Sequence, residues 1–359
     1  MEETLWYEIT QPPFQVYGVQ PEEGCLTRRL PESVAATVSE GVHRLSSYGT
    51  GGRVRFATDS AFVALKAEYL PGELHTVNNH CLTYGFDLYC AAAGQTDAFV
   101  DAFCPLNGFD GISAQWQIKT RNQGKLTDYT LNLPVFSGLK RLEIGLEAGC
   151  RLESGQPYRN ELPVIFYGSS ITHGASAGRP GNTYENFISQ RYNLHYRNLG
   201  FAGLAKAEDA MAVYLSQQEM CAFVCDYDHN ASDAEHLQKT HYKLYETIRR
   251  KHPDIPYIMI SKPDFFHDPG INARRRTVIF ESYVRARKTG DRKVWFVDGE
   301  TLFEGEHALS CTSDGCHPND LGFYRMSCKI GAVLAEALKL ADALSIKRVQ
   351  SSIAMAGPV

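Results

Sequence analysis

Five short, continuously apolar runs, separated by helix-like segments, constrain the fold of this chain more than any other feature of its sequence. The runs cover residues 163–168, 196–201, 222–228, 256–262 and 294–300. The helix-like segments cover residues 183–192, 207–217, 233–251, 273–288 and 318–344. Strands that are apolar throughout are buried on both faces, and strands that alternate with helices form parallel sheets joined by right-handed crossovers. The sequence therefore predicts an α/β/α domain with helices on both faces of a parallel sheet.

The first part of the chain has a different pattern, in which apolar residues recur at spacing two. Val, Phe, Tyr, Leu and Thr dominate short runs that Gly, Pro, Asn and Asp separate. The runs cover residues 52–59, 60–69, 84–94, 96–104, 128–136 and 139–149. Evenly spaced short strands without helical periodicity are typical of an antiparallel β-sandwich. Residues 1–40 are expected to form an irregular lead-in with a strand or two.

A polar segment separates the two patterns. Residues 154–161 read SGQPYRNE, and domain boundaries commonly fall in such polar segments with Gly and Pro. We therefore predict a β-sandwich domain over residues 1–155, an α/β domain over 156–345 and a loosely held tail over 346–359. A length of 359 residues agrees with about two domains and needs no disulfide or metal to support the core.

Charge and hydropathy exclude several classes of protein. The 36 basic and 41 acidic residues give a net charge of −5, whereas nucleic-acid-binding proteins usually carry a basic excess. No apolar run approaches the roughly 20 residues of a membrane-spanning helix. The first residues, MEETLWYEITQPPF, lack the basic end and apolar core of a signal peptide. We predict a cytoplasmic protein with neither a nucleic-acid nor a membrane partner.

The cysteines predict neither a disulfide framework nor a metal site. There are ten of them, and no two form a C-x-x-C pair. The tightest group, Cys311 and Cys316 beside His317, lacks zinc-finger spacing. Reduced, partly buried thiols are the expectation for a cytoplasmic protein.

Polar residues gather where the predicted parallel strands end. They are Ser170 after the first strand, Gly203 after the second, Asn230 after the third, and Asp314 and His317 before the last helix. Ligands of open α/β sheets collect beyond the carboxyl ends of the strands, so these residues should meet at one edge. A serine, a histidine, an aspartate and amide donors are the groups that acyl transfer requires. Such chemistry needs no metal and no organic cofactor.

These residues resemble the SGNH hydrolases, the GDSL esterase and lipase superfamily. The matching residues are, in chain order, Gly168-Ser169-Ser170, Gly203, Asn230, and the pair Asp314 and His317. Two blocks depart from the family pattern: Ser169 stands in place of the usual aspartate, and the third block lacks the Gly-x-Asn-Asp form. The resemblance implies a flavodoxin-like catalytic domain.

The resemblance also implies a role for each matching residue. Ser170 would be the nucleophile, His317 the general base, and Asp314 the acid that orients His317. The oxyanion hole would consist of the Ser170 and Gly203 N–H groups and the Asn230 amide. A side chain at position 203 could block the approach of the oxyanion, which favours glycine there.

A second motif resembles the domain that precedes the catalytic domain in one bacterial branch of SGNH proteins. Residues 85–89 read Gly-Phe-Asp-Leu-Tyr, the Gly-x-Asp-Leu-Tyr pattern of a jelly-roll-like β-sandwich. That branch tolerates Gly-Ser-Ser at the nucleophile. The resemblance implies a serine esterase that acts on O-acyl esters, O-acetyl above all, of a small molecule or an oligosaccharide.

Other interpretations of single residues remain open. Residues 174–178 fit the G-x-S-x-G nucleophile elbow around Ser176, but the predicted strand ends six residues before Gly174. Asn230 heads an Asn-Ala-Ser glycosylation sequence, which would require secretion. His173 would either contact substrate or cap a turn.

Two further features have a structural and a functional interpretation. Asp87 and Tyr89 are more often fold-defining residues of a sandwich than ligands. The basic cluster Arg274–Arg276 is expected to form a solvated helix face.

Two other functions are compatible with the same sequence. An acyltransferase would use the same triad to pass the acyl group to an alcohol acceptor. A catalytically silent carbohydrate-binding protein would have lost the triad, against which the intact Ser170, Asp314 and His317 argue. The sequence leaves the oligomeric state open, a homo-oligomer included.

Overall fold

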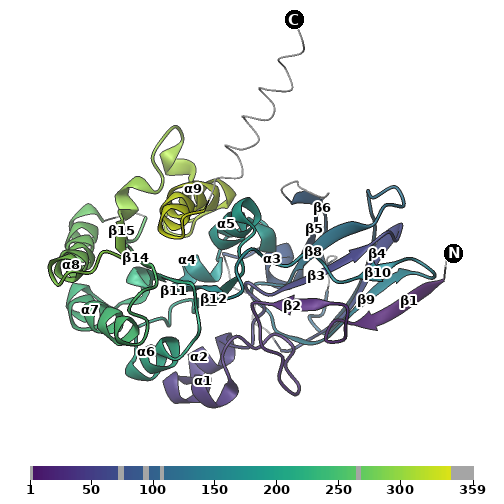
Figure 1. Cartoon of the computed structure of the whole chain (residues 1–359), viewed down its shortest axis with the longest axis horizontal. Helices are drawn as coiled ribbons and strands as arrows, with labels where there is room; N and C mark the ends of the chain where they lie inside the picture. The colour runs from purple at the N-terminus through teal and green to yellow at the C-terminus, as the bar shows by residue number, and fades with distance from the viewer. Residues whose placement is uncertain (1–2, 72–76, 92–96, 106–108, 264–267, 341–359) are drawn as a thin grey trace, which may run out of the picture.

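The computed structural model describes residues 3–71, 77–91, 97–105, 109–263 and 268–340. Figure 1 shows two parts side by side, an antiparallel part next to the N-terminus and a part in which helices flank a parallel sheet. The predicted fold class, a β-sandwich domain followed by an α/β domain, is confirmed.

The N-terminal part consists of two antiparallel sheets packed around one hydrophobic core. Its strands are β1 (Thr4–Glu8), β2 (Gln15–Tyr17), β3 (Arg53–Thr58), β4 (Phe62–Tyr69), β5 (Phe86–Ala91), β6 (Ala98–Phe103), β7 (Ser113–Lys119), β8 (Thr127–Asn132), β9 (Leu139–Glu147) and β10 (Leu152–Glu153). One sheet has the order β1-β9-β4-β7; the other has the order β10-β3-β8-β5-β6, with β2 paired to β3. Six of these strands match the predicted runs, although residues 92–94 of one run lie outside the described residues.

Strand β7 was not predicted from the sequence. Its residues alternate: Ala114, Trp116 and Ile118 pack against the core while Gln115 and Gln117 are exposed. As an edge strand with one polar face, β7 lacks the enrichment in β-branched and aromatic residues by which strands are recognised.

Three short helices in the N-terminal part were also missed. They are α1 (Glu32–Val38), α2 (Glu40–Leu45) and α3 (His80–Tyr84). Helices this short have no stable existence alone, and tertiary packing stabilises them here. Ser39 caps α2 by accepting a hydrogen bond from the Val42 N–H. Residues 32–45 therefore form two helices where an irregular lead-in was expected.

The C-terminal part is a five-stranded parallel sheet. Its strands are β11 (Val164–Gly168), β12 (Tyr196–Gly200), β13 (Ala222–Asp226), β14 (Tyr257–Ile260) and β15 (Val294–Val297). All five coincide with the predicted apolar runs. The order β12-β11-β13-β14-β15 is the flavodoxin-like one, in which ligands bind where the strand order reverses, between β11 and β13.

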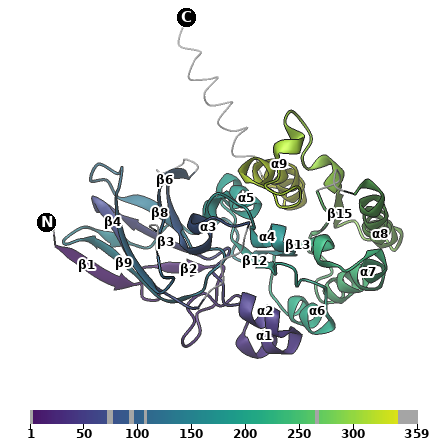
Figure 2. The same ribbon diagram turned by 180° about the vertical axis from the view of Figure 1, so that it is seen from behind.

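Helices cover both faces of this sheet. They are α4 (Ser170–His173), α5 (Tyr184–Tyr192), α6 (Asp209–Ser216), α7 (Ala234–Lys251), α8 (Pro269–Lys288) and α9 (Asp320–Ala337), with short 3-10 turns η1 (Pro180–Asn182), η2 (Asp228–Asn230), η3 (Gly299–Thr301) and η4 (Ala308–Ser310). Figures 1 and 2 show α6, α7 and α8 on one face, with α5 and α9 on the other. The last helix ends at Ala337, earlier than predicted, and residues 341–344 of that prediction lie outside the described residues.

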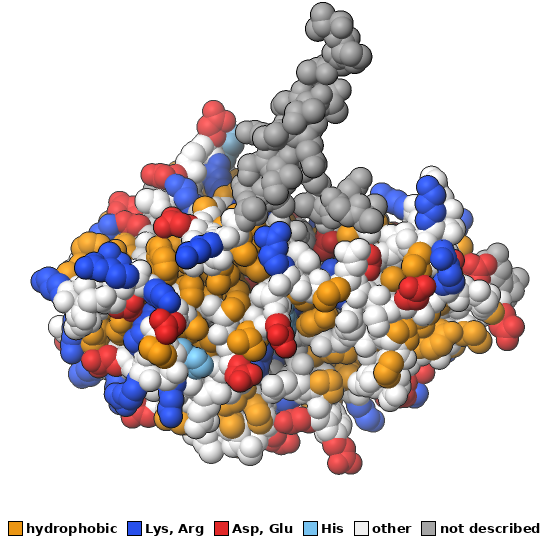
Figure 3. All heavy atoms as spheres, viewed as in Figure 1, with side chains coloured by type: hydrophobic (Ala, Val, Ile, Leu, Met, Phe, Trp, Pro, Cys, Tyr) orange, Lys and Arg blue, Asp and Glu red, His pale blue; other side chains and the backbone are white. Residues whose placement is uncertain are grey.

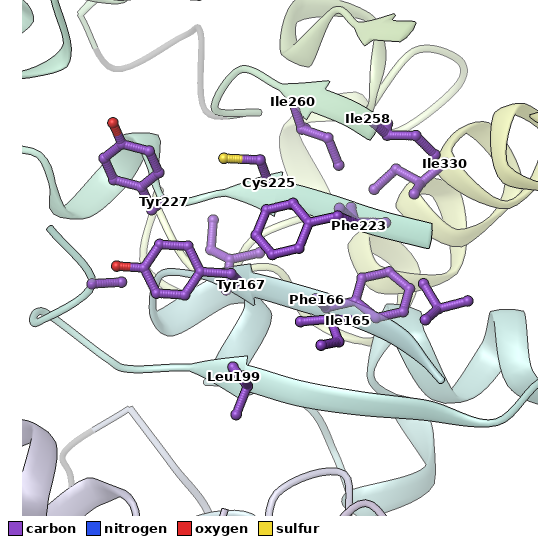
Figure 4. Packing of buried hydrophobic residues seen from close by; sticks show 14 of the residues in the cluster. Ile165, Phe166, Tyr167, Leu199, Phe223, Cys225, Tyr227, Ile258, Ile260 and Ile330 are labelled. Atoms are coloured by element: carbon purple, nitrogen blue, oxygen red, sulfur yellow. The ribbon is translucent and has the colours of Figure 1, made fainter. Parts of the chain in front are cut away.

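The hydrophobic core of the α/β part extends into the N-terminal segment. Figure 4 shows side chains of the central strands on both faces of the sheet: Phe166 packs against Tyr184 of α5, and Phe223, on the opposite face, packs against Tyr257 of β14. Leu30, Leu45 and Tyr48 belong to this same core, although they lie between strands β2 and β3 of the N-terminal part. The boundary at residue 155 stays a prediction; the last strand of the antiparallel part ends at Glu153 and the first parallel strand begins at Val164, yet part of the N-terminal segment packs with the α/β core.

The surface in view in Figure 3 mixes acidic and basic side chains without a basic stripe. No helix in the described part of the chain is long and apolar enough to span a membrane. All ten cysteines lie in described residues, and none forms a disulfide. The cytoplasmic location stays a prediction.

Candidate active site

Ser170 lies at a sharp turn between the first parallel strand and a short helix. Strand β11 ends at Gly168, and Ser170 is the first residue of α4. Ser169 is buried, and its hydroxyl accepts a hydrogen bond from the Ile171 N–H at 3.2 Å. Serine is a good N-cap residue, so Ser169 does locally what an aspartate could do at this position.

His317 lies between Ser170 and Asp314. Its Nε2 is 2.9 Å from Ser170 Oγ, and its Nδ1 is 2.7 Å from Asp314 Oδ2. An ionised carboxylate only accepts hydrogen bonds, so Nδ1 carries the ring proton and Nε2 accepts from the serine hydroxyl. The three residues that the sequence nominated are thus within hydrogen-bonding distance in the order that a serine triad requires.

Asp314 stays ionised because its own loop donates to it. Burial by itself would raise its pKa, but hydrogen bonds from the His317 N–H, the His317 ring and the Cys316 N–H lower the pKa to about 2. The two backbone bonds to Oδ1 measure 2.7 and 3.0 Å. The backbone N–H groups of the loop therefore fix the orientation of the Asp314 carboxylate, which leaves Oδ2 facing the imidazole.

Gly203 lies in the loop that follows β12. Its φ of +75° is in the left-handed region that favours glycine, and an added Cβ would meet no atom within 4 Å. The positive φ angle therefore favours glycine at this position, whatever space surrounds it. The steric reason expected from the sequence, a clash with the oxyanion, stays a prediction.

Asn230 ends the 3-10 turn that follows β13. Its side-chain Oδ1 accepts a hydrogen bond from the Ala205 N–H at 3.2 Å. Because the Ala205 N–H can only donate, the amide oxygen must face it, and the Nδ2 group faces elsewhere. The bond also joins the Asn230 turn to the Gly203 loop.

The backbone N–H groups of Ser170 and Gly203 are two of the three predicted oxyanion donors. Within the described residues, neither the Ser170 N–H nor the Gly203 N–H donates to a protein acceptor. The strand ends hold these groups together, since the Phe201 N–H bonds the Gly168 carbonyl and the Ser169 N–H bonds the Asp226 carbonyl. Their convergence on one oxyanion stays a prediction that this arrangement supports.

Ser176 has partners unlike those of a nucleophile. Its hydroxyl donates to the Val77 carbonyl at 3.1 Å, and its N–H donates to Asn78 Oδ1 at 3.0 Å. It lies in the loop after α4 rather than at the end of a strand. These contacts join the catalytic domain to the N-terminal part and leave the G-x-S-x-G interpretation without support.

His173 is fully buried and does not reach the surface. Its Nε2 lies 3.1 Å from the Val135 carbonyl, and its ring stacks on Phe136 at 4.3 Å. Substrate contact, as predicted from the sequence, is not supported by this position. His173 instead connects the α4 turn to the N-terminal part.

Asp87 and Tyr89 of the Gly-x-Asp-Leu-Tyr motif also face the catalytic domain. Asp87 is buried and accepts from Asn132 Nδ2 and from the Gly181 N–H, each at 2.8 Å, and pairs with Arg179 at 3.2 Å. Tyr89 accepts a hydrogen bond from Arg179. An added Cβ on Gly181 would come within 2.6 Å of the Tyr89 ring. Asp87 therefore holds the sandwich through Asn132, as the structural interpretation from the sequence expects, and also joins it to the α/β part through Arg179 and Gly181.

Asp226 contacts helix α4, the helix that begins with Ser170, and it was not singled out from the sequence. It is buried at the end of β13, and its Oδ2 accepts from Thr172 Oγ1 at 3.1 Å. Burial raises its pKa to about 8, so the carboxyl is largely neutral at pH 7. Its place at a strand end was the only sequence signal for it.

The described residues contain no cluster of three or more His, Cys, Asp or Glu that could hold a metal ion.

Fold and site geometry together define a class: a flavodoxin-like α/β protein with Ser170, His317 and Asp314 hydrogen-bonded in series at the carboxyl edge of the sheet. Comparison with known families agrees. Residues 161–335 match the GDSL-like lipase/acylhydrolase family, and residues 4–152 match the N-terminal Gly-x-Asp-Leu-Tyr domain of SGNH-hydrolase-type esterases. The chain therefore belongs to the SGNH/GDSL-like hydrolases that carry this N-terminal domain.

Solved structures share the whole two-part architecture. A protein of Bacteroides ovatus named as a GDSL-like lipase has 25% identity and a TM-score of 0.84, over 95% of this chain and 99% of that one. A salicylyl-acyltransferase from a tetracycline biosynthetic pathway has 20% identity and a TM-score of 0.75, over 93% and 99%. A family two carbohydrate esterase from Clostridium thermocellum, in complex with cellohexaose, has 13% identity and a TM-score of 0.58, over 81% and 93%. No curated protein sequence matches the chain.

Proposed function

We propose that this protein is a serine esterase that hydrolyses O-acyl esters, most of all O-acetyl esters, through an acyl-enzyme on Ser170. The observation that carries the proposal is the chain of contacts from Ser170 Oγ to His317 Nε2 at 2.9 Å and from His317 Nδ1 to Asp314 at 2.7 Å. This geometry fits a nucleophile, its general base and the group that orients the base.

The reaction would proceed in two balanced steps. Ser170 Oγ attacks the ester carbonyl carbon while His317 Nε2 accepts the hydroxyl proton. The tetrahedral intermediate collapses, the carbon–oxygen bond to the leaving alcohol breaks, and His317 returns the proton to that alcohol. Water then attacks the acyl-enzyme with His317 again as base, which releases the carboxylic acid and restores Ser170. Asp314, ionised down to about pH 2, stabilises the imidazolium in both steps.

The oxyanion of each tetrahedral intermediate would be stabilised by three donors. They are the backbone N–H groups of Ser170 and Gly203 and the Nδ2 group of Asn230. The loss of one such donor costs roughly 2.7–4 kcal/mol of barrier. The amide orientation of Asn230, fixed by the bond from Ala205, supports its assignment as a donor.

A carbohydrate or other small molecule would carry the acyl group. The bacterial branch that the chain resembles supports this substrate class. So do the names of two structural neighbours, the cellohexaose-bound esterase of Clostridium thermocellum and an acetyl xylan esterase of Butyrivibrio proteoclasticus. An acetylated oligosaccharide is therefore the first substrate to test after a simple ester.

The decisive experiment compares the hydrolysis of 4-nitrophenyl acetate by the wild type, Ser170→Ala and Ser176→Ala. We expect Ser170→Ala to lose at least about 10³-fold in kcat, because the nucleophile is gone. Ser176→Ala is the matched control, a loop serine of the same domain, and should keep its activity. The reverse result would show that the site assignment is wrong, and an inactive wild type would favour an acyltransferase or a binding protein.

A second candidate function is acyl transfer to an alcohol. The same triad would serve it, with the acceptor hydroxyl in place of water, and one structural neighbour is named as a salicylyl-acyltransferase. A product assay with an acyl donor and a candidate sugar or alcohol acceptor separates the two. The free acid as main product supports the esterase, and a new ester supports the transferase.

A further inference from the structure

Arg275 lies inside the protein although it is the middle member of a basic run. Its side chain is only 6% exposed, whereas that of its neighbour Arg276 is 33% exposed. The solvated helix face expected for residues 274–276 is therefore wrong for this position. A buried guanidinium is costly to desolvate unless its donors are satisfied, so its partners indicate what it holds in place.

The partners of Arg275 all belong to the turn that carries Asn230. Its Nε donates to Asp228 Oδ1 at 2.8 Å, and its Nη2 donates to the Asp228 carbonyl and, at 3.0 Å, to the Ala231 carbonyl. The guanidinium thus contacts Asp228, the first residue of η2, and Ala231, the residue that follows η2, and Asn230 lies between these two in the chain. The planar fork of arginine matches this set of acceptors, which a lysine ammonium cannot reproduce.

Asp228 connects the same turn to the next strand. Its side chain is fully buried, and Oδ2 accepts a hydrogen bond from the Lys262 N–H at 2.9 Å, just beyond β14. Both carboxylate oxygens are therefore occupied by fixed donors. The turn is held from α8 on one side and from the end of β14 on the other.

The orientation of the Asn230 amide depends on where this turn lies. Its Oδ1 bonds the Ala205 N–H at 3.2 Å, and its backbone N–H bonds the Tyr227 carbonyl at 2.9 Å. A shift of the turn would lengthen the bond to Ala205 and move the Nδ2 group away from the oxyanion. Misplacement by about 1 Å can cost roughly 10²-fold in rate.

We propose that Arg275 is a positioning residue, which clamps the 228–231 turn so that the Asn230 amide meets the oxyanion. This inference rests on the proposed esterase function. Arg275 itself contacts no reacting atom in this arrangement. It acts on the reaction through Asn230.

A purely structural role for the same ion pair is the competing explanation. Breaking a buried ion pair is destabilising wherever it occurs, so a loss of stability cannot distinguish the two roles. Coupling to Asn230 can. If Arg275 acts through Asn230, its replacement should matter only while the asparagine is present.

The test is a double-mutant cycle with Arg275→Lys and Asn230→Ala. For each variant, kcat and KM for 4-nitrophenyl acetate are measured at a temperature well below the melting temperatures of all the variants. We expect Asn230→Ala to lower kcat about 10²-fold or more. Arg275→Lys should lower kcat at least about tenfold with KM nearly unchanged, and should change kcat less than about twofold in the Asn230→Ala background. Arg276→Lys, the matched control on the same helix, is paired with Asp298 and should leave kcat within about twofold.

Equal kcat losses from Arg275→Lys in both backgrounds, or a folded Arg275→Lys with wild-type kcat, overturn the proposal. If Arg275→Lys does not fold, Asp228→Asn carries the same cycle, because it weakens the clamp from its other partner. Ser170→Ala is assayed alongside. Activity that depends on Ser170 without coupling between Arg275 and Asn230 overturns the clamp alone, whereas activity that does not depend on Ser170 overturns both proposals.

Discussion

Asp314 and its imidazole partner, His317, lie in one four-residue loop, and this loop fixes the orientation of the Asp314 carboxylate. Its two oxygens are divided: Oδ1 accepts from the backbone N–H groups of Cys316 and His317, while Oδ2 accepts from the ring. The side chain is only one-third exposed. The carboxylate is therefore held in one orientation, and the tautomer of His317 follows from it.

Asp314→Asn is predicted to lower kcat about 10⁴-fold while the fold is retained. An asparagine can keep accepting the backbone bonds through its oxygen, but its NH₂ group then faces Nδ1. The ring proton would move to Nε2, which could no longer accept the proton of Ser170. The kcat for 4-nitrophenyl acetate and the melting temperature should be measured together. A variant that melts like the wild type and keeps more than a tenth of its kcat would contradict the assigned role.

At the scale of the elements, helix α7 carries a fully buried imidazole, that of His241. His241 is 1% exposed, stacks on Tyr227 at 5.9 Å, and neither of its ring nitrogens has a hydrogen-bond partner among the described residues. Burial lowers its pKa from the ordinary 6.5 to about 4. The folded protein therefore holds this histidine neutral.

His241→Phe is predicted to reduce the loss of stability on acidification. The unfolded chain takes up a proton as the pH falls below about 6.5, whereas folded His241 does so only near pH 4. Its contribution is thus fully present above pH 6.5 and is lost between 6.5 and 4, by up to about 3 kcal/mol. Urea unfolding of both proteins at pH 7.5 and pH 5 measures the difference. Equal pH dependence in the two proteins would refute the prediction, whatever their absolute stabilities.

At the scale of the whole molecule, the N-terminal part contributes buried groups directly beneath the catalytic loops. Arg29 is fully buried, has no carboxylate partner among the described residues, and donates to the carbonyls of Asn198 at 3.1 Å and Gly200 at 2.8 Å, at the end of β12. Burial lowers its pKa to about 9. The loop that carries Gly203 begins at this strand end, so the two parts of the chain build the site together.

Deletion of residues 1–155 is therefore predicted to abolish soluble, active protein. The truncated chain would expose the apolar surface that Leu30, Leu45 and Tyr48 cover, and would lose the donors of Arg29. Solubility, elution as a single species and hydrolysis of 4-nitrophenyl acetate should be compared with the full-length protein. A soluble truncation with full activity would show that the N-terminal part is an independent module.

The sequence identified the strands and the triad because both depend on local patterns. A strand that is buried on both faces must be apolar throughout, so the five parallel strands were visible without any contact information. Ser170, Gly203, Asn230, Asp314 and His317 were nominated because the carboxyl ends of parallel strands meet at one edge, and the structure brings Ser170, His317 and Asp314 within hydrogen-bonding distance. The residues of the candidate site could therefore be nominated from residue type and order, and their catalytic roles stay predictions.

Only the tertiary structure decided which other residues are buried around the candidate site and which partners they bind. Nothing in a run of three arginines distinguishes Arg275, which is buried against Asp228, from Arg276, which stays at the surface. Likewise, His173 and residues 32–45 owe their roles to contacts between the two parts. The reason is physical: strand periodicity and residue order are properties of the chain itself, whereas burial and the choice of partner depend on residues distant in sequence.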